Sequence, residues 1–380
     1  MLPLLYQNHL KFKLKDRNYI LANIVVILLQ SIKRVSLEKL ANALPLGIKF
    51  ESRRKRLQRF LSLPSLNFET IWFPILSNLL EIYFEKNDLV YIAIDRTNWG
   101  KINLLVTSLI WDKRAFPVYF TLMPKLGSSN FKEQTTHISK IMPIFKDYRI
   151  CLLGDREFCS VRLANWLSQK SASFCLRLKK NEFIEIEKQI WTDLDSLELV
   201  PGTSLFFQGI KVTKTKGLPR FNLAAKWKKK ISGFAPKEPW FILTNLKSLD
   251  LAIAAYKKRF NIEQMFRDFK TGGYNLEDTN VSDNRLISLI LLITIAYTSA
   301  TLHGQKIKRK GIQKYVGRVK ESGRLQRRHS SFYIGLHAQT WVKFSYELID
   351  LIQELMKLNR NKQKYYLRGM RARSLALSAL

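Results

Sequence analysis

Four side chains suited to phosphate and metal chemistry occur along one short segment: Tyr256, Arg259, Glu263 and Lys270. On an α-helix these offsets place all four within an arc of roughly 60°. One carboxylate then lies among groups that bind phosphate, an arrangement that suits a metal ion held against a phosphate backbone. The alternative is a solvated helix face with ordinary ion pairs. The spacing alone leaves both interpretations open.

Two aspartates follow apolar runs that are typical of short buried strands. Residues 89–94 precede Asp95, and residues 149–154 precede Asp155. In an α/β layer, residues at the carboxyl end of a strand project into a cleft instead of the core. The alternative for either aspartate alone is that Asp simply terminates a strand well.

The chain is strongly basic, with 64 Lys and Arg against 30 Asp and Glu and a net charge of +34. This excess predicts a polyanionic partner, and nucleic acid is the expected one. The charge gathers at Lys226 and residues 228–230, and beyond residue 300, where 18 basic residues outnumber 4 acidic ones. An early basic cluster consists of Arg53, Arg54, Lys55, Arg56 and Arg59.

Membrane insertion and secretion are not expected. No segment reaches the 18 apolar residues that a spanning helix needs, so the longest apolar stretch, 286–300, is predicted to be a buried helix. Residues 1–30 show no secretory signal, which favours the cytoplasm. Cys151, Cys159 and Cys175 lack paired spacing, so we expect small buried thiols and neither disulfides nor a zinc site. The five histidines form no metal-ligand or triad pattern.

The first 88 residues are predicted to form a helical DNA-binding domain. Apolar helical runs at 19–30, 36–44 and 68–84 flank the early basic cluster and indicate helix-turn-helix character. Such helices often serve packing alone. Arg53, Arg54 and Arg56 nevertheless favour phosphate contact.

Residues 89–300 are predicted to form an α/β layer with a mixed sheet. A strand to residue 94, a hairpin over 104–123 and a helix at 131–148 come first, and a strand at 149–154, a helix at 160–169 and a strand at 173–178 follow. Strand-like pieces and turn residues over about 181–238 indicate an inserted β subdomain. Residues 240–246 resume the strand pattern, and residues 301–380 are predicted to be a basic, mostly helical region for DNA contact or dimerisation, through cations such as Arg324, Arg327 and Arg328.

The aspartate of 93–99, the aspartate of 154–158 and the Tyr256, Arg259, Glu263, Lys270 helix together resemble the cut-and-paste DDE transposases of bacterial insertion sequences. The chain is similar in particular to the family with the YREK signature, insertion-sequence family four. The resemblance spans about residues 20–300 and includes the β insertion. It implies an RNase H-like catalytic core.

By this resemblance, Asp95, Asp155 and Glu263 would be the catalytic and metal-binding triad. Two Mg²⁺ ions are the expected cofactors, with Mn²⁺ as a substitute, since hard cations share carboxylate ligands in phosphoryl transfer. Tyr256, Arg259 and Lys270 would bind phosphates at the transposon end. The partners would be double-stranded DNA, as transposon ends and target, and a second copy of the chain. Glu157, Asp268 and Glu277 are nearby acids that we do not expect to be ligands.

The resemblance also implies excision through a DNA hairpin with an extruded base. Stacking on an aromatic side chain would offset the cost of extrusion. Trp227 stands beside Lys226 and Lys228 and is the first choice, with Trp191 second; a packing role is the alternative for both. Two other classes stay open: an RNase H-like structure-selective nuclease, and a non-catalytic DNA-binding protein derived from a transposase.

Overall fold

The computed structural model describes residues 2–214, 219–229, 237–281, 283–320, 322, 329–358 and 360–379. The chain forms two compact units, one from Met1–Ile75 with Asp268–Leu380 and the other from Leu76–Arg267. The unit boundaries therefore differ from the predicted domain boundaries at residues 88 and 300. Lys230, Arg324, Arg327 and Arg328 lie outside the described residues.

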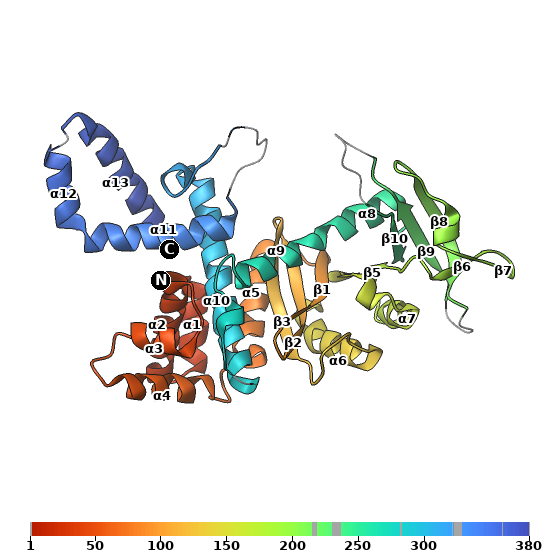
Figure 1. Ribbon diagram of the computed structural model, residues 1–380, viewed down its shortest axis with the longest axis horizontal. Helices are drawn as coiled ribbons and strands as arrows, with labels where there is room; N and C mark the ends of the chain where they lie inside the picture. Colours follow the sequence, from red (N-terminus) through yellow and green to blue (C-terminus); the bar gives the residue numbers. More distant parts are fainter. Residues whose placement is uncertain are drawn as a thin grey trace. The chain divides into compact units, whose positions relative to one another are not determined.

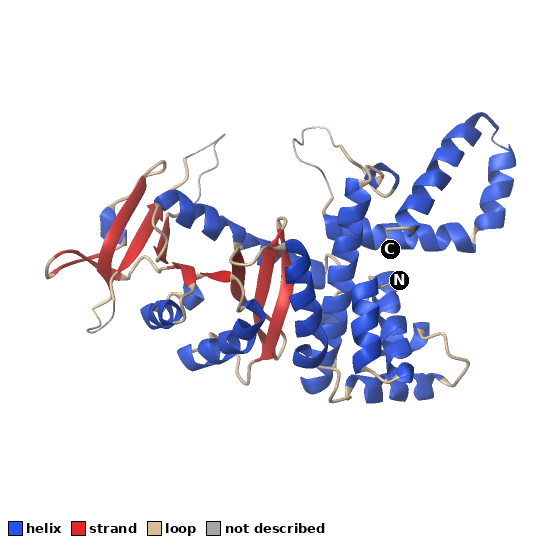
Figure 2. Cartoon of the chain, turned by 180° about the vertical axis from the view of Figure 1, so that it is seen from behind, coloured by secondary structure: helices blue, strands red, loops and turns tan. Residues whose placement is uncertain are grey.

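The first unit is helical in its described parts (Figures 1 and 2). Its N-terminal segment contains α1 (Leu4–Lys13), α2 (Asp16–Ile32), α3 (Leu37–Ala43), α4 (Phe50–Leu61) and the π-helix η1 (Phe68–Trp72). Its C-terminal segment contains α10 (Asp283–Arg309), α11 (Ser331–Glu347), α12 (Ile349–Leu358) and α13 (Gln363–Leu377). The helices predicted from the apolar runs between residues 19 and 61 are confirmed.

Helix α10 is the core of the first unit. By length and composition alone it could cross a membrane, but 94% of its most apolar part is buried inside the protein. Tyr6 donates a hydrogen bond to Thr298 Oγ1, and Gln30 donates one to the Ala296 carbonyl, so α1 and α2 both pack on α10. The prediction of a buried helix over 286–300 is confirmed.

The second unit contains a ten-stranded mixed sheet. The strands are β1 (Leu89–Trp99), β2 (Ile102–Trp111), β3 (Arg114–Leu122), β4 (Arg149–Gly154), β5 (Ser173–Arg177), β6 (Phe183–Glu187), β7 (Ile190–Asp193), β8 (Ser204–Val212), β9 (Phe221–Lys226) and β10 (Trp240–Thr244). Their order is β3-β2-β1-β4-β5-β10-β9-β8-β6-β7. The predicted α/β layer with a mixed sheet is confirmed.

The helices of the second unit include α5 (Phe73–Tyr83), which crosses the boundary at residue 75, α6 (Phe131–Ile141), α7 (Val161–Gln169) and α8 (Leu249–Lys258). The hairpin of β2 and β3 turns at Asp112 and Lys113, with φ of 45° and 61°. Two positive φ values are typical of the tight turns that match strand twist. Cys151 and Cys175 are buried, as predicted, and Cys159 is partly exposed.

The strands of the insertion continue the sheet of the core. Strand β9 pairs with β10, β10 pairs with β5, and β8 pairs with β9, all antiparallel. The prediction of strands at 205–213 and 220–227 is confirmed. The small hairpin of β6 and β7 was not predicted from the sequence. The insertion is therefore part of one continuous hydrogen-bonded sheet (Figure 1).

Candidate active site

Asp95 and Asp155 lie side by side where the parallel pairing of β1 and β4 ends. The register pairs Ile94 of β1 with Gly154 of β4, and the residue that follows each of them is an aspartate. A Cβ at Gly154 would lie 2.8 Å from the Phe158 Cβ, which explains a glycine before Asp155. The prediction that β1 stops at residue 94 is wrong. Strand β1 continues to Trp99 because β2 still pairs with it.

Backbone amides hold both aspartates. Arg96 N donates to Asp95 Oδ1 at 2.7 Å, and Glu157 N donates to Asp155 Oδ1 at 2.8 Å. The second contact caps the 3₁₀ turn η3 (Arg156–Phe158). Short hydrogen bonds from backbone amides restrict the rotamers of both carboxylates and so preset their position.

The Tyr256, Arg259, Glu263, Lys270 segment is not one regular helix, and that prediction is wrong. Helix α8 ends at Lys258, and α9 (Phe260–Phe269) begins after Arg259. Arg259 keeps helical dihedral angles, with φ of −53° and ψ of −39°, so the chain direction is nearly preserved across the break. Glu263 lies in α9. Lys270 follows the end of α9, belongs to the first unit, and pairs with Glu277 at 2.8 Å.

Arg259 joins two of the predicted metal ligands. Its Nη1 donates to Asp95 Oδ2 at 3.1 Å, and its Nη2 donates to Glu263 Oε1 at 2.6 Å. The Arg259 side chain is 7% exposed, whereas that of Glu263 is 49% exposed. Charge-assisted pairs of this length are among the stronger hydrogen bonds of proteins.

The surroundings of Asp95 disfavour its charged form despite this arginine. Burial, reinforced by the carboxylate of Asp155 and then that of Glu263, raises the pKa of Asp95 to about 7, while Arg259 acts in the opposite direction. A divalent cation would relieve this crowding, so the donor set fits the expected metal chemically. Across the described residues, no three His, Cys, Asp or Glu side chains already lie close enough to hold a metal ion together.

Tyr256 is fully buried in an aromatic cluster. Its ring meets Trp240 edge-on with centroids 5.2 Å apart, and Trp240 stacks on Phe260 at 5.7 Å. Burial raises the pKa of the Tyr256 hydroxyl. The nearby guanidinium of Arg259 acts on that pKa in the opposite direction.

Glu157 serves a structural purpose. Arg96 Nε donates to both of its oxygens, at 2.9 and 3.2 Å, and Ser129 donates to it from both N and Oγ at 2.9 Å. The Glu157 side chain is only 13% exposed. Both of its oxygens therefore accept hydrogen bonds within the protein, and our expectation that Glu157 is not a ligand stays a prediction. Glu277 is likewise engaged, by Lys270.

Sequence reasoning missed Arg177 and Glu238. The register pairs Gly154 with Leu176, so Arg177 on β5 lies in the same row as Asp95 on β1 and as Asp155, the residue after β4. Glu238 Oε1 accepts hydrogen bonds from Arg177 at 2.9 Å and from Arg156. The strand-end rule that found the two aspartates could have found Arg177, had it been applied to the third parallel strand.

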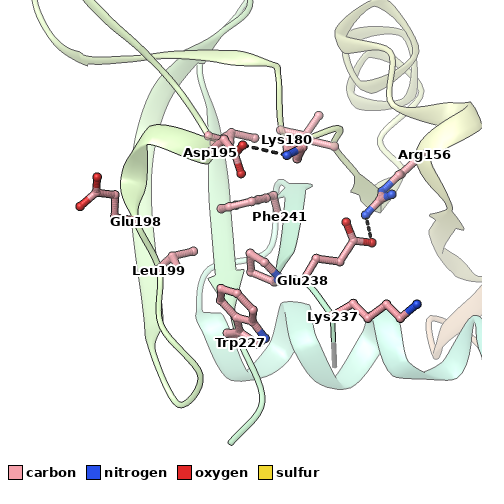
Figure 3. A pocket seen from close by; sticks show the side chains of 12 residues that line it. Arg156, Lys180, Asp195, Glu198, Leu199, Trp227, Lys237, Glu238 and Phe241 are labelled. Carbon is pink, nitrogen blue, oxygen red and sulfur yellow. Dashed lines mark hydrogen bonds and ion pairs between the residues drawn. The ribbon is translucent and has the colours of Figure 1, made fainter. Parts of the chain in front are cut away.

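Trp227 lines a pocket of about 230 Å³ next to this cluster (Figure 3). Apolar walls are formed by Phe241, Pro239 and Leu178. The charged side chains of the lining are of both signs: Arg156, Lys180, Lys237, Asp195, Glu198 and Glu238. Trp191, on β7, is not among the lining residues. The structure thus places Trp227, and not Trp191, in a cavity with apolar walls and charged groups of both signs.

In the first unit, the early basic cluster lies on α4. Arg54 pairs with Glu38 at 3.2 Å, and Arg53 donates to the Leu44 carbonyl, so both side chains have intramolecular partners. Arg56 is partly buried. Lys55 and Arg59 are exposed and line a surface recess of about 550 Å³ together with Arg285. The exposed positive charge of α4 is therefore centred on Lys55 and Arg59.

Residues 132–299 match a family model described as a transposase DDE domain. This part of the chain is therefore similar to a transposase domain. The match includes Asp155 and Glu263 and begins after Asp95. No curated protein matches the chain.

Two solved structures show likeness to this chain at 12% identity each. One is the cryo-EM structure of the piggyBac transposase synaptic complex with hairpin DNA, with a TM-score of 0.45, covering 92% of this chain and 78% of that chain. The other is the crystal structure of Marinitoga piezophila Argonaute in complex with 5′ OH guide RNA. It has a TM-score of 0.24 and covers 60% of this chain and 34% of that chain.

Proposed function

We propose that this chain is a DNA transposase of the YREK insertion-sequence family with an RNase H-like core, acting in the bacterial cytoplasm. It would cleave transposon ends and join them to target DNA. The observation that supports the proposal is that Asp95 lies beside Asp155 at the end of the paired strands and that Arg259 bridges Asp95 to Glu263, in a chain whose residues 132–299 match a transposase DDE domain.

Asp95, Asp155 and Glu263 would hold two Mg²⁺ ions, for which Mn²⁺ could substitute. Bound cations of this kind activate water or a 3′ hydroxyl and stabilise the leaving oxygen. The amides of Arg96 and Glu157 orient the two aspartates before DNA arrives, which lowers the entropy cost of assembling the site. The Asp95 side chain is only 15% exposed, so it would limit the access of water to a phosphate bound beside it.

Tyr256, Arg259 and Lys270 are proposed to position phosphates of the transposon end. Around the Trp227 pocket, Arg156 is paired with Glu238 and Lys180 with Asp195, so these cations would exchange their partners for phosphate when DNA binds. The pocket's apolar walls suit a base extruded beside a hairpin. Lys55 and Arg59 on α4 would contribute phosphate contacts from the first unit. Two transposon ends must meet in one complex, so the active form is proposed to be a homodimer.

The triad is tested by Asp95→Asn, Asp155→Asn and Glu263→Gln. Each change keeps side-chain shape but removes a negatively charged oxygen ligand, so each variant should retain binding to the element's end. Magnesium-dependent nicking should fall by several orders of magnitude, because the three groups act as a unit. The measurement is a gel with a labelled end duplex, in Mg²⁺ and in Ca²⁺. Near-normal nicking by any variant would remove that residue from the triad.

The two alternative classes differ in measurable ways. A structure-selective nuclease would cleave branched DNA but would not join a 3′ end to a target, so a strand-transfer assay separates it from a transposase. A non-catalytic DNA-binding protein would bind the same duplex and leave it intact in every metal. The placement of Asp95, Asp155 and Glu263 favours catalysis, since phosphate binding alone gains nothing from carboxylates.

A further inference from the structure

Arg259 combines three properties that are rarely found together. It is almost fully buried, its two terminal nitrogens donate to carboxylates from different elements, and its guanidinium lies over the Phe260 ring at 4.8 Å. Its Nε is buried without an acceptor among the groups that the structure describes. A buried cation is stable only while a counter-charge accompanies it. Asp95 and Glu263 supply that counter-charge here.

The same two carboxylates are the ones proposed to bind metal. An oxygen that accepts from a guanidinium at 2.6 Å has that lone pair committed, so a cation must compete with Arg259 for Glu263. Arg259 cannot simply withdraw, because a buried guanidinium without an anion costs several kcal/mol. It can leave the carboxylates only if another anion accepts it. The phosphate of bound DNA is such an anion.

We propose that Arg259 is an exchangeable counter-ion that couples metal binding to DNA binding. Without DNA it neutralises Asp95 and Glu263 and keeps them from a metal ion. A phosphate of the transposon end takes over the guanidinium and frees the carboxylates. This inference rests on the proposed function, because it requires the acidic site to be the metal site. It would keep the enzyme from cutting before an end is bound.

The contact with Glu263 is the one expected to open first. The Glu263 side chain is 49% exposed, while Asp95 and Arg259 are 15% and 7% exposed. Solvent and an approaching phosphate therefore reach the guanidinium from the Glu263 side. The pair with Asp95 is shielded and would act as the pivot about which the arginine turns.

The test measures Mn²⁺ binding to the full chain without DNA, by electron paramagnetic resonance of free Mn²⁺. Wild type should bind weakly, and Arg259→Ala should bind between about 5- and 150-fold more tightly, the usual range of coupling between two sites. Arg267→Ala is the matched control, since it removes the same charge from an exposed position on α9. It should bind Mn²⁺ as wild type does.

A second arm adds the end duplex. DNA should tighten Mn²⁺ binding by wild type and by Arg267→Ala, and should give Arg259→Ala a much smaller gain, because its carboxylates are already free. Linkage requires Mn²⁺ to tighten DNA binding by the same factor. Equal gains in all three proteins would overturn the inference.

Folding is checked by thermal unfolding with and without Mn²⁺. Arg259→Ala leaves two carboxylates without a counter-ion, so Mn²⁺ should raise its midpoint more than that of wild type. Arg259→Lys retains a cation but cannot bridge both carboxylates with a planar fork, and should bind Mn²⁺ with intermediate affinity. If both variants fold and bind Mn²⁺ no more tightly than wild type, the counter-ion proposal is wrong, while the proposed metal site is unaffected. If Asp95→Asn leaves Mn²⁺ binding unchanged, both in wild type and in the Arg259 variants, the proposed metal site is wrong. The counter-ion inference is then wrong as well.

Discussion

At the scale of single residues, an ion pair next to the two aspartates links the two segments that carry them. Arg96 follows Asp95 and Glu157 lies two residues after Asp155, so their pair at 2.9 Å spans β1 and η3. Arg96 Nη1 also donates to Asn103 Oδ1 at 3.0 Å, and Asn103 donates to the carbonyls of Lys125 and Gly127. The network fixes the spacing of the two aspartates.

Glu157→Gln should loosen this network. The amide keeps the shape but loses the charge that holds Arg96, which should cost about 1–3 kcal/mol of stability. Mn²⁺ affinity and nicking should fall, while binding of the end duplex stays near that of wild type. The measurements are chemical denaturation, Mn²⁺ titration and the nicking gel.

Glu187→Gln is the control, since it makes the same change at an exposed position of β6. If Glu157→Gln loses stability but keeps wild-type Mn²⁺ affinity, Glu157 only supports the fold. A loss of nicking as large as that of Asp155→Asn, with full stability, would instead make Glu157 a ligand.

Trp227 carries a separate prediction. If an extruded base stacks on its ring, Trp227→Ala should slow hairpin formation by roughly 5- to 150-fold, which corresponds to about 1–3 kcal/mol for one stacked base. First-strand nicking should change little, because nicking precedes extrusion. The readout is the ratio of hairpin to nicked product on a denaturing gel. Trp191→Ala is the control, and hairpins at the normal rate in Trp227→Ala would exclude the stacking role.

At the scale of elements, the sequence allowed most strands and helices to be predicted, but not where their pairing changes. Residues 89–94 read as a strand because they are continuously apolar. The strand runs on to Trp99 through hydrogen bonds to β2, and those bonds depend on a partner that local composition does not reveal. The break between α8 and α9 at Arg259 was missed for a similar reason. Arg259 is held by ion pairs with Asp95 and Glu263, and the helical periodicity of the sequence does not reveal such contacts.

The candidate site shows the same division. Asp95, Asp155 and Glu263 could be singled out because strand ends and helical spacing are local signals. That Arg259 lies between Asp95 and Glu263 could not be predicted, since it depends on how α8 packs against the sheet. Arg177 was missed because its significance comes from the register of β5 against β4.

His137, on helix α6, predicts that the stability of the fold depends on pH. Its ring nitrogens contact Thr121 Oγ1 at 2.7 Å and Thr107 Oγ1 at 3.2 Å, and burial lowers the pKa of His137 to about 3. The unfolded chain protonates this histidine near pH 6.5, so between pH 6.5 and 3 the unfolded state binds more protons and stability falls as pH falls. The loss approaches about 1.4 kcal/mol per pH unit at most.

His137→Gln should remove that part of the slope. We expect the variant to be less stable than wild type at pH 7.5, through its altered hydrogen bonds, and to close the gap as the pH is lowered to 4.5. Denaturant titrations across this range measure the difference. A gap that stays constant with pH would show that His137 is protonated in the folded protein.

At the scale of the whole molecule, the net charge of +34 predicts strongly salt-dependent DNA binding. Removing Lys55 and Arg59 together should flatten the plot of log affinity against log salt by about 0.9 for each phosphate that the variant no longer neutralises. Lys86 and Lys188, two exposed lysines of the other unit, form the matched double control. An unchanged slope in the α4 variant would assign this surface to another purpose. The same assay tests Arg324, Arg327 and Arg328.

The unbroken hydrogen bonding from β3 to β7 bears on how such a chain can be shortened. Loops and appended modules can often be trimmed from a protein without harm. Here, excision of residues 181–238 would remove β9, the hydrogen-bonding partner of β10. Strand β10, Trp240–Thr244, would then be an apolar edge strand with unpaired amides and carbonyls. Open edges of that kind recruit other chains. We therefore expect a shortened version to aggregate through this edge before it loses its chemistry.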